Sequence, residues 1–366
     1  MARKITSDRI LFTAALLLAC VSVVMVYSAS APMALERYQQ PYFFLTRQAL
    51  WTALGLAVLA ITMRVDYKTY RNQTLVWALI GLVGLMLVAV LFSSPVNGTR
   101  RWFGLGGLGI QPSELAKIAV VMFVALVLER RMHRIDELSY SLAPVAIVVG
   151  LICALVLVQP DFGTSLSLVT IVGVMVFAAG LNYGYLFGAA AVALPGIYYV
   201  VMSVEYRRQR ILAFLDPWAD PLGNGFQIIQ SLIAMGSGGL TGSGILEGGQ
   251  TLLFLPEPHT DFIFAVIGEQ LGLVGATVVL VCFCVIAWRG LRIAARAEDA
   301  FGSFVALGLT VMIAVQAFVN MSMVIGLLPT KGIPLPLVSA GGSSLLINML
   351  GLGVLLNISQ HQSVDA

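Results

Sequence analysis

Long apolar runs recur along almost the whole chain, and they constrain the fold more than any other feature. Each approaches the roughly 20 residues that a helix needs to cross the hydrocarbon core of a bilayer. Only 11% of the 366 residues are charged, whereas a soluble domain carries roughly a quarter. We therefore predict an all-α integral membrane protein with about ten transmembrane helices, at residues 10–26, 49–63, 75–92, 115–128, 142–158, 164–179, 185–202, 262–288, 304–327 and 345–358.

The basic residues predict how the chain is oriented. Loops on the cytoplasmic side of a membrane carry an excess of Lys and Arg. If the N-terminus is cytoplasmic, ten spans place 12 of the 21 Lys and Arg on that side. We therefore expect a multi-pass protein of the cytoplasmic membrane with both termini in the cytoplasm. The other nine fall in outer segments or inside spans, namely Arg37, Arg47, Arg100, Arg101, Lys117, Arg207, Arg208, Arg210 and Lys331.

The whole chain, residues 1–366, is expected to form a single membrane domain. Its longest break in hydrophobicity, residues 204–260, predicts a large extracytoplasmic loop, in which apolar positions at 211–215 and 226–233 indicate two short interfacial helices. The first apolar run is longer than the core of a signal peptide, which favours a retained helix. All four cysteines lie inside apolar runs, so neither a disulfide framework nor a zinc cluster is indicated.

Ionisable side chains in or beside apolar spans usually face a cavity and have partners. Pro112 and Ser113 indicate a helix start, and Glu114 and Lys117 lie on one face of that helix. These two residues form either an ordinary ion pair or part of a site, because Lys117 needs an internal partner or an anionic ligand. Asp161 lies just before the predicted span at 164–179. It can cap that helix and also have a functional role, because the two are compatible.

Three ionisable side chains, Glu257, His259 and Asp261, occupy five positions just before the 262–288 span. Thr260 or Asp261 is positioned to cap that helix, and a cap needs only one such residue. A carboxylate at a membrane boundary can be desolvated enough to raise its pKa toward that of a working base. A His and Glu metal site is the weaker alternative, because no further ligand cluster accompanies these residues.

Irregular backbone is expected after the 304–327 span, since three prolines lie between residues 329 and 336. At membrane depth such backbone must be buried in protein or line a wet cavity. Its N–H groups, Lys331 and hydroxyls such as Ser339 and Ser343 could bind phosphate. A re-entrant structural loop is the equally weighted alternative.

Taken together, these motifs resemble the SEDS family, the shape, elongation, division and sporulation proteins. The strongest carriers are LPEPHTDFIFAVIGE at 255–269 and LPTKG at 328–332, with PLP at 334–336 and GGSS at 341–344. Supporting matches are Asn97-Gly98, Arg101-Trp102, QPSE at 111–114, QPD at 159–161 and Gln230-Ser231. Residues 215–219 and 329–332 look more like the division-type members than the elongation-type members. The chain departs from the usual pattern at Phe226, Gln270 and Ala340, and Gln270 weakens any mechanism that needs two adjacent carboxylates.

The resemblance implies a peptidoglycan glycosyltransferase that polymerises lipid II, a disaccharide-pentapeptide carried on undecaprenyl diphosphate, at the outer face of the membrane. It also implies a class B penicillin-binding transpeptidase and other division-complex membrane proteins as partners, with the protein at the division septum. No nucleic acid partner is expected. An inverting displacement of this kind needs a base for the acceptor hydroxyl and positive charge for the departing diphosphate.

The resemblance assigns the general base to Asp261. Glu257, Glu114 and Asp161 are candidates for tuning it, orienting sugars or holding a divalent cation, and Mg²⁺ or Mn²⁺ would suit carboxylate and diphosphate oxygens. The metal candidates are Asp261, Glu114 and Glu257. Candidates for contact with substrate are Arg47, Arg101, Lys117 and Lys331 for the diphosphate and Trp102 for a sugar face, with His259, Ser339 and Ser343 as supporting residues.

Two other functions fit part of the pattern. Carboxylates and arginines inside a bundle are also typical of a transporter, here a lipid II flippase, but a flippase needs polar residues on a path to the inner leaflet. The polar residues instead gather toward the outer side. A non-catalytic scaffold for division proteins would not account for Glu257, His259 and Asp261 together.

Overall fold

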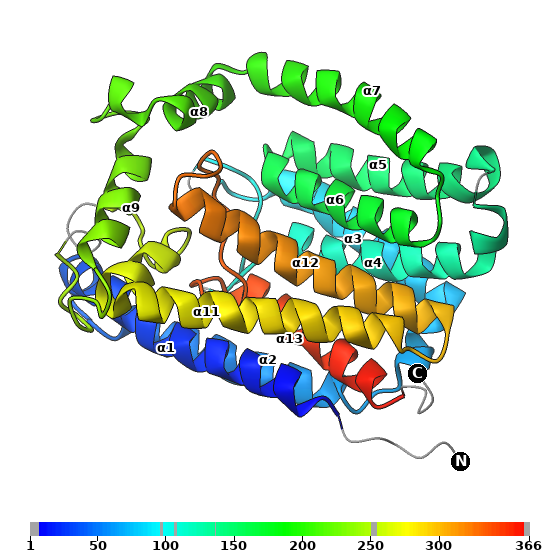
Figure 1. Ribbon diagram of the computed structural model, residues 1–366, viewed down its shortest axis with the longest axis horizontal. Helices are drawn as coiled ribbons and strands as arrows, with labels where there is room; N and C mark the ends of the chain where they lie inside the picture. Colours follow the sequence, from blue (N-terminus) through cyan, green and yellow to red (C-terminus); the bar gives the residue numbers. More distant parts are fainter. Residues whose placement is uncertain (1–6, 96–97, 106–107, 136, 250–254, 362–366) are drawn as a thin grey trace.

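The computed structural model describes residues 7–95, 98–105, 108–135, 137–249 and 255–361. Ten of its helices coincide with the ten predicted spans, which confirms the all-α membrane fold (Figure 1). The two predicted short helices are α8 and α9. The elements are α1 (Arg9–Tyr38), α2 (Phe43–Thr62), α3 (Gln73–Ala89), β1 (Phe103–Leu105), β2 (Leu108–Ile110), α4 (Pro112–Arg131), α5 (Ala143–Val158), α6 (Phe162–Ala178), α7 (Tyr183–Met202), α8 (Glu205–Leu215), α9 (Phe226–Ser237), α11 (Ile263–Ala295), α12 (Ala300–Val324) and α13 (Gly342–Ser359).

Seven helices of the described chain are long and apolar enough to cross a membrane by length and composition. They are α1, α2, α3, α5, α11, α12 and α13. Helix α4 has the length but carries Glu114, Lys117 and Glu129 among its residues, while α6 and the second half of α7 are shorter apolar helices. Helix α4 therefore differs from these seven in charge, and α6 differs from them in length.

Helix α12 lies in the middle of the bundle and packs against α4, α6, α11 and α13 (Figure 1). Most of its side chains are buried, and the buried ones lie on every face of the helix. The two ends of the described chain meet at one end of the bundle, where the Asp8 backbone N–H donates to Ser359 Oγ over 3.1 Å. An even number of crossings brings the termini together in this way.

Helix α7 stands apart from this packed core. It contacts α6 and α8, and in Figure 1 it passes over the bundle as an arch. Helices α8 and α9 continue the arch and return the chain to α11, against which α9 packs. In its described residues, 204–249 and 255–260, the predicted outer loop is thus an ordered connection that contains two helices.

Helix α11 is broken at Gly272, where the sequence predicts a continuous span. Gly272 has φ 65° and ψ −165°, a conformation that favours glycine. The segment after α9 supplies the lost hydrogen bonds: Ser243 N–H donates to Glu269 O over 3.0 Å, and Leu273 N–H donates to Gly239 O over 2.9 Å. Backbone groups at membrane depth need such internal partners. The Gly-rich stretch 236–239 is held against this break.

Candidate active site

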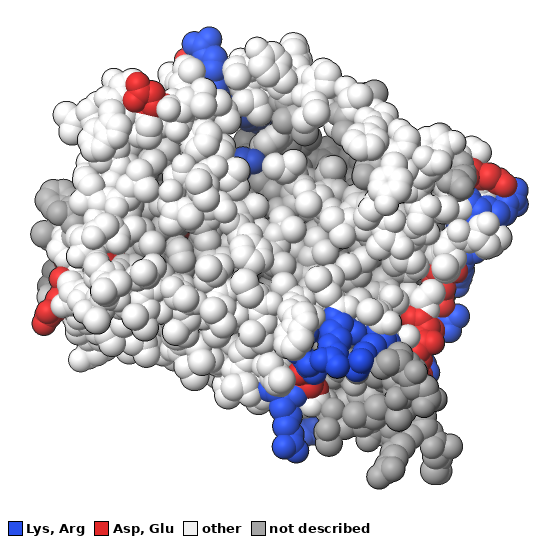
Figure 2. All heavy atoms as spheres, viewed as in Figure 1, with Lys and Arg blue, Asp and Glu red and all other residues white. Residues whose placement is uncertain are grey.

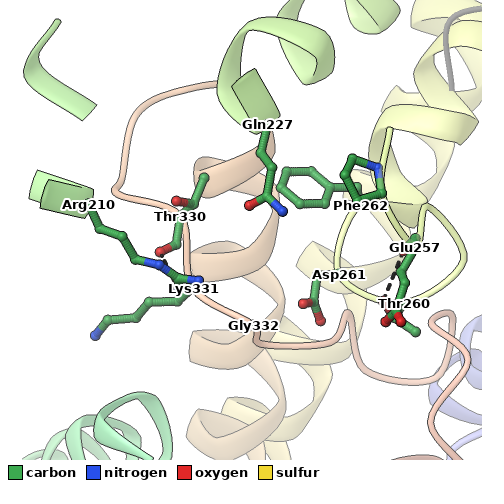
Figure 3. Close-up of a pocket in the computed structure, with 10 residues that line it drawn as sticks. Arg210, Gln227, Glu257, Thr260, Asp261, Phe262, Thr330, Lys331 and Gly332 are labelled. Atoms are coloured by element: carbon green, nitrogen blue, oxygen red, sulfur yellow. Dashed lines mark hydrogen bonds between the residues drawn. The ribbon is translucent and has the colours of Figure 1, made fainter. Parts of the chain in front are cut away.

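A polar cavity of about 260 Å³ opens at the end of the bundle opposite the termini (Figure 3). Three segments that are distant in sequence form its walls: the α8–α9 arm, the segment before α11, and the irregular segment after α12. Ten residues line it, namely Arg210, Gln227, Pro256, Glu257, Thr260, Asp261, Phe262, Thr330, Lys331 and Gly332. The two motifs with the strongest family resemblance therefore meet in one place.

Asp261 presents its carboxylate to this cavity. Helix α11 begins at Ile263 with no side-chain cap, so the prediction that Thr260 or Asp261 caps it is wrong. The backbone of the preceding turn instead directs the Asp261 side chain into the cavity (Figure 3). A Cβ added at Gly332 would lie 3.1 Å from Asp261 Oδ2, so a glycine there gives the carboxylate its room.

The surroundings of Asp261 favour a proton acceptor. Burial, with the nearby Glu257 carboxylate as a second cause, raises the pKa of Asp261 to about 6, while Arg210 acts in the opposite direction. A carboxylate with this pKa is ionised at neutral pH and is a stronger base than an ordinary aspartate. Such a pKa suits a general base in a reaction run near pH 7.

Glu257 is held in position by a tight turn. Its φ of 44° lies in the left-handed region, which is unusual for a residue with a side chain. The N–H and Oγ1 of Thr260 both donate to the Glu257 carbonyl, over 3.1 and 2.9 Å. The turn keeps two carboxylates, Glu257 and Asp261, on the same wall of the cavity.

Cationic groups form the opposite wall. Arg210 Nη1 donates to the Thr330 carbonyl over 3.1 Å, and Lys331 Nζ lies 4.2 Å from the ring centre of Phe162. Arg207 faces the same ring, with 5.9 Å between its Cζ and the ring centre. Burial lowers the pKa of Lys331 to about 8, an effect that Asp161 opposes. Lys331 therefore remains mainly protonated at pH 7 and attracts anions.

Asp161 supports this wall from behind. Its Oδ1 accepts from Thr164 N–H over 3.1 Å and caps α6, as predicted. Its Oδ2 accepts from Gln111 Nε2 over 3.2 Å, which ties α6 to the start of α4. The Asp161 carboxylate thus caps α6 and also places a favourable negative charge near Lys331.

Glu114 and Lys117 are brought together, away from the cavity lining. Helix α4 begins at Pro112 as predicted, and Lys117 Nζ donates to Glu114 Oε1 over 2.8 Å and to Gln316 Oε1 over 2.7 Å. Both charged side chains are buried. Lys117 has the internal partner that its depth requires, which favours the ion-pair interpretation over diphosphate contact.

Arg47, Arg101 and Trp102 also lie off the cavity lining. Arg101 donates to the carbonyls of Gln159 and Pro160, over 2.7 and 2.6 Å, and so holds the β1–β2 hairpin to the α5–α6 turn. Trp102 covers Gly109 on the second strand, since a Cβ added there would lie 3.1 Å from the indole. Arg47 lies over Phe43 on α2. The Asn97 match falls outside the described residues.

The three supporting residues, His259, Ser339 and Ser343, are buried, and none of them lines the cavity. The His259 ring packs 4.5 Å from that of Phe44, and burial lowers its pKa to about 4, so it is neutral at pH 7. Ser339 Oγ accepts from Leu335 N–H over 2.8 Å. Ser343 is buried at the start of α13. Each shapes the segments around the cavity.

The sequence does not single out Gln227, Gln316 or Asn320, whereas Arg210 is one of the nine basic residues that it leaves in outer segments or spans. Arg210 and Gln227 reach the cavity from the α8–α9 arm, whose path no local pattern reveals. Gln316 and Asn320 lie one turn apart on α12 and bond to the segments on either side of the cavity. The sequence does contain a signal for the last two residues. They are amides at i and i+4 in an otherwise apolar span, and an amide at that depth needs hydrogen-bond partners.

The carboxylates do not form a protein-built metal site. Glu114 is engaged by Lys117, so the three predicted metal candidates do not come together. Over the described residues, no group of three or more His, Cys, Asp or Glu side chains is placed to hold an ion. Glu257 and Asp261 remain as a pair on one wall.

The fold and the cavity define a polytopic membrane protein with a buried carboxylate facing cationic groups at one end of its helix bundle. Residues 8–364 match the FtsW, RodA and SpoVE family, described as cell cycle proteins. The chain belongs to this family, which confirms the resemblance drawn from its motifs.

Relatives along the whole chain agree with this assignment. A probable peptidoglycan glycosyltransferase FtsW of Geobacter metallireducens is 43% identical, covering 96% of this chain and 94% of that protein. The stage V sporulation protein E of Bacillus subtilis is 41% identical, covering 98% of both. The fold resembles a chain of a peptidoglycan synthase complex, with a TM-score of 0.79, 31% identity and coverage of 98% and 99%. It also resembles the rod shape determining protein RodA of Thermus thermophilus, with a TM-score of 0.71, 27% identity and coverage of 98% of both chains.

Proposed function

We propose that this chain is a division-type peptidoglycan glycosyltransferase that polymerises lipid II at the outer face of the cytoplasmic membrane. One observation carries the proposal: a single cavity holds Asp261, with a raised pKa, on one wall and Arg210 and Lys331 on the other. Several relatives along the whole chain are named as probable peptidoglycan glycosyltransferases FtsW, which supports the division type over the elongation type.

The chemistry follows from the two walls. Asp261 takes the proton of the acceptor sugar's 4-hydroxyl as its oxygen attacks the anomeric carbon of the donor. The bond from that carbon to the lipid diphosphate breaks, and the negative charge that develops there is stabilised by Arg210 and Lys331. A single displacement with the base and the leaving group on opposite sides inverts the anomeric configuration.

The lipid part of the substrate has a route to the cavity. Figure 2 shows a hollow beneath the arch of α7, with Lys or Arg atoms inside it. The helices of the bundle run horizontally in this view (Figure 1), so the hollow that faces the viewer opens across the helix axes. A polyprenyl chain can lie against the apolar helices while its diphosphate reaches the cationic wall.

The proposal includes a divalent cation that is held jointly by the protein and the substrate. Two carboxylates, Glu257 and Asp261, are too few for a protein-built site, but Mg²⁺ is often held by one or two carboxylates together with substrate phosphates. Such an ion would neutralise part of the diphosphate charge. We propose Mg²⁺ or Mn²⁺ on these grounds.

The partner and the cellular place are also proposed. A class B penicillin-binding transpeptidase is the expected partner, because the similar chain of known structure belongs to a peptidoglycan synthase complex. The basic residues gather at the end of the bundle that holds the termini, which favours cytoplasmic termini. Other division proteins and the septum follow from the division type.

The experiment compares wild type with Asp261→Asn in lipid II polymerisation by the purified protein together with its transpeptidase. Loss of a general base costs roughly 10²- to 10⁴-fold in rate. The exposed α8 residue Glu205 provides the control, Glu205→Gln, which should polymerise normally. Asp261→Asn should fold and associate normally, with an unchanged or higher Tm, because a desolvated charge is removed. Wild-type polymerisation by Asp261→Asn would exclude Asp261 as the base and leave lipid II transport as the next function to test.

A further inference from the structure

Asn320 occupies a special position between the two halves of the cavity. It is a fully buried side chain on α12, the central helix. Its Nδ2 donates to the main-chain carbonyl of Asp261 over 2.8 Å and to that of Ile333 over 2.7 Å. The first carbonyl belongs to the residue that carries the base, and the second lies two residues after Lys331. One amide group therefore joins two segments that are some 70 residues apart in sequence.

The orientation of this amide is determined by its neighbours. Both partners are carbonyl oxygens, which only accept hydrogen bonds, so the NH₂ end must face them and both of its hydrogens are used. Within the described chain, Oδ1 has no hydrogen-bond partner. The side chain thus acts as a double donor at a buried point, where an unsatisfied carbonyl would cost roughly 1–3 kcal/mol.

Gln316, one turn earlier on α12, makes a parallel but different connection. Its Nε2 donates to the Pro334 carbonyl over 3.0 Å, while its Oε1 accepts from Lys117. Gln316 therefore fixes the irregular segment to α4, and over the described residues its side chain makes no hydrogen bond to the Asp261 segment. Only Asn320 of these two contacts both walls.

We propose that Asn320 is a positioning residue that sets the separation between Asp261 and Lys331. The reaction needs the base and the cation at the correct separation at the same time. Binding of the diphosphate needs only the cation. Interactions required together only in the transition state affect kcat more than KM. The proposal rests on the proposed function of Asp261, and it adds a role for a residue outside the cavity lining.

The test compares lipid II polymerisation by Asn320→Leu and Asn348→Leu, in complex with the transpeptidase and matched for folded protein by size-exclusion chromatography. Asn348 is an equally buried asparagine, on α13, whose Nδ2 bonds only within its own helix, to Ser344, and whose Oδ1 also lacks a described partner. Asn320→Leu should lower kcat at least tenfold and change KM for lipid II less than threefold. Asn348→Leu should leave both constants near wild type, although both variants lower Tm.

A second variant covers the case in which Asn320→Leu does not fold. Asn320→Gln keeps both amide donors on a longer arm, so it should fold and retain an intermediate kcat with an unchanged KM. The inference is overturned if the folded Asn320 variants show wild-type kcat, or if kcat falls equally in Asn348→Leu. If Asp261→Asn is active, the proposed function fails; if Asp261→Asn is inactive while the Asn320 variants are normal, only the positioning role fails.

Discussion

The two ends of the helix bundle use charge in opposite ways. At the end with the termini, acids and bases are paired: Arg289 Nε bonds to Asp8 at 2.6 Å, and Lys68 bonds to Glu298 at 3.0 Å. At the other end, Asp261, Glu257 and Lys331 line a cavity and form no ion pair with one another or with other described residues.

The difference distinguishes structural charges from functional ones. A paired charge has its field cancelled nearby and mainly holds two helices together. A desolvated charge without an ion-pair partner is available to interact with a ligand. Its perturbed pKa is therefore a sign of a candidate site. The Glu114–Lys117 pair sharpens this point, because it lies near the start of α4, toward the cavity end of the bundle, and yet its two charges are paired.

The largest expected effect is on stability, at the Glu114–Lys117 pair. Lys117→Met leaves a buried Glu114 carboxylate without its partner, and breaking such a pair costs roughly 3–5 kcal/mol. We expect a large fall in Tm in detergent. The double variant Glu114→Met with Lys117→Met removes both charges and should recover most of the loss. A double variant no more stable than Lys117→Met would indicate a role beyond pairing.

The next effect is on activity, at Lys331. Lys331→Gln removes a cation from the diphosphate wall, and loss of one such stabilising group costs about 10²-fold in kcat. Lys331→Arg keeps the charge and should retain more activity than Lys331→Gln. Steady-state polymerisation assays measure both, with Lys68→Gln as the control from the paired end. Equal activity of Lys331→Gln and wild type would remove Lys331 from the mechanism.

A smaller effect is expected in the pH dependence. Asp261 works only when ionised, so kcat/KM should fall as the pH drops below about 6, the pKa of this carboxyl. Glu257 raises that pKa and Arg210 lowers it. Glu257→Gln should therefore move the acidic limb to lower pH, and Arg210→Gln should move it to higher pH. Shifts in the same direction for both variants would contradict this electrostatic account.

The smallest effect is expected at the exposed Lys68–Glu298 pair, at the end of the bundle that holds the termini. Lys68→Gln removes an ion pair whose partners are both partly exposed, and such pairs contribute roughly 0.2–1 kcal/mol. Its Tm should stay within a few degrees of wild type, and its polymerisation rate should be unchanged. A marked loss of polymerisation would mean that the two ends of the bundle are coupled.

Local patterns in the sequence determined much of this protein. Apolar runs predict the ten spans because each helix must meet lipid or protein along its whole length. Pro112 predicts the start of α4, and the i,i+3 spacing predicts the Glu114–Lys117 pair. The motifs around Asp261 and Lys331 were identified by their family resemblance, and the cavity contains both.

Only the tertiary structure decided how these parts meet. Arg210 and Gln227 reach the cavity because α8 and α9 return over the bundle. Asn320 joins two loops because its side chain bonds to the carbonyls of Asp261 and Ile333. The break at Gly272 depends on a distant segment that supplies its hydrogen bonds. Helical periodicity reports only which face of one segment is apolar. The choice of partner across the bundle depends on packing between segments, and that choice places the Asp261 carboxylate opposite the cations.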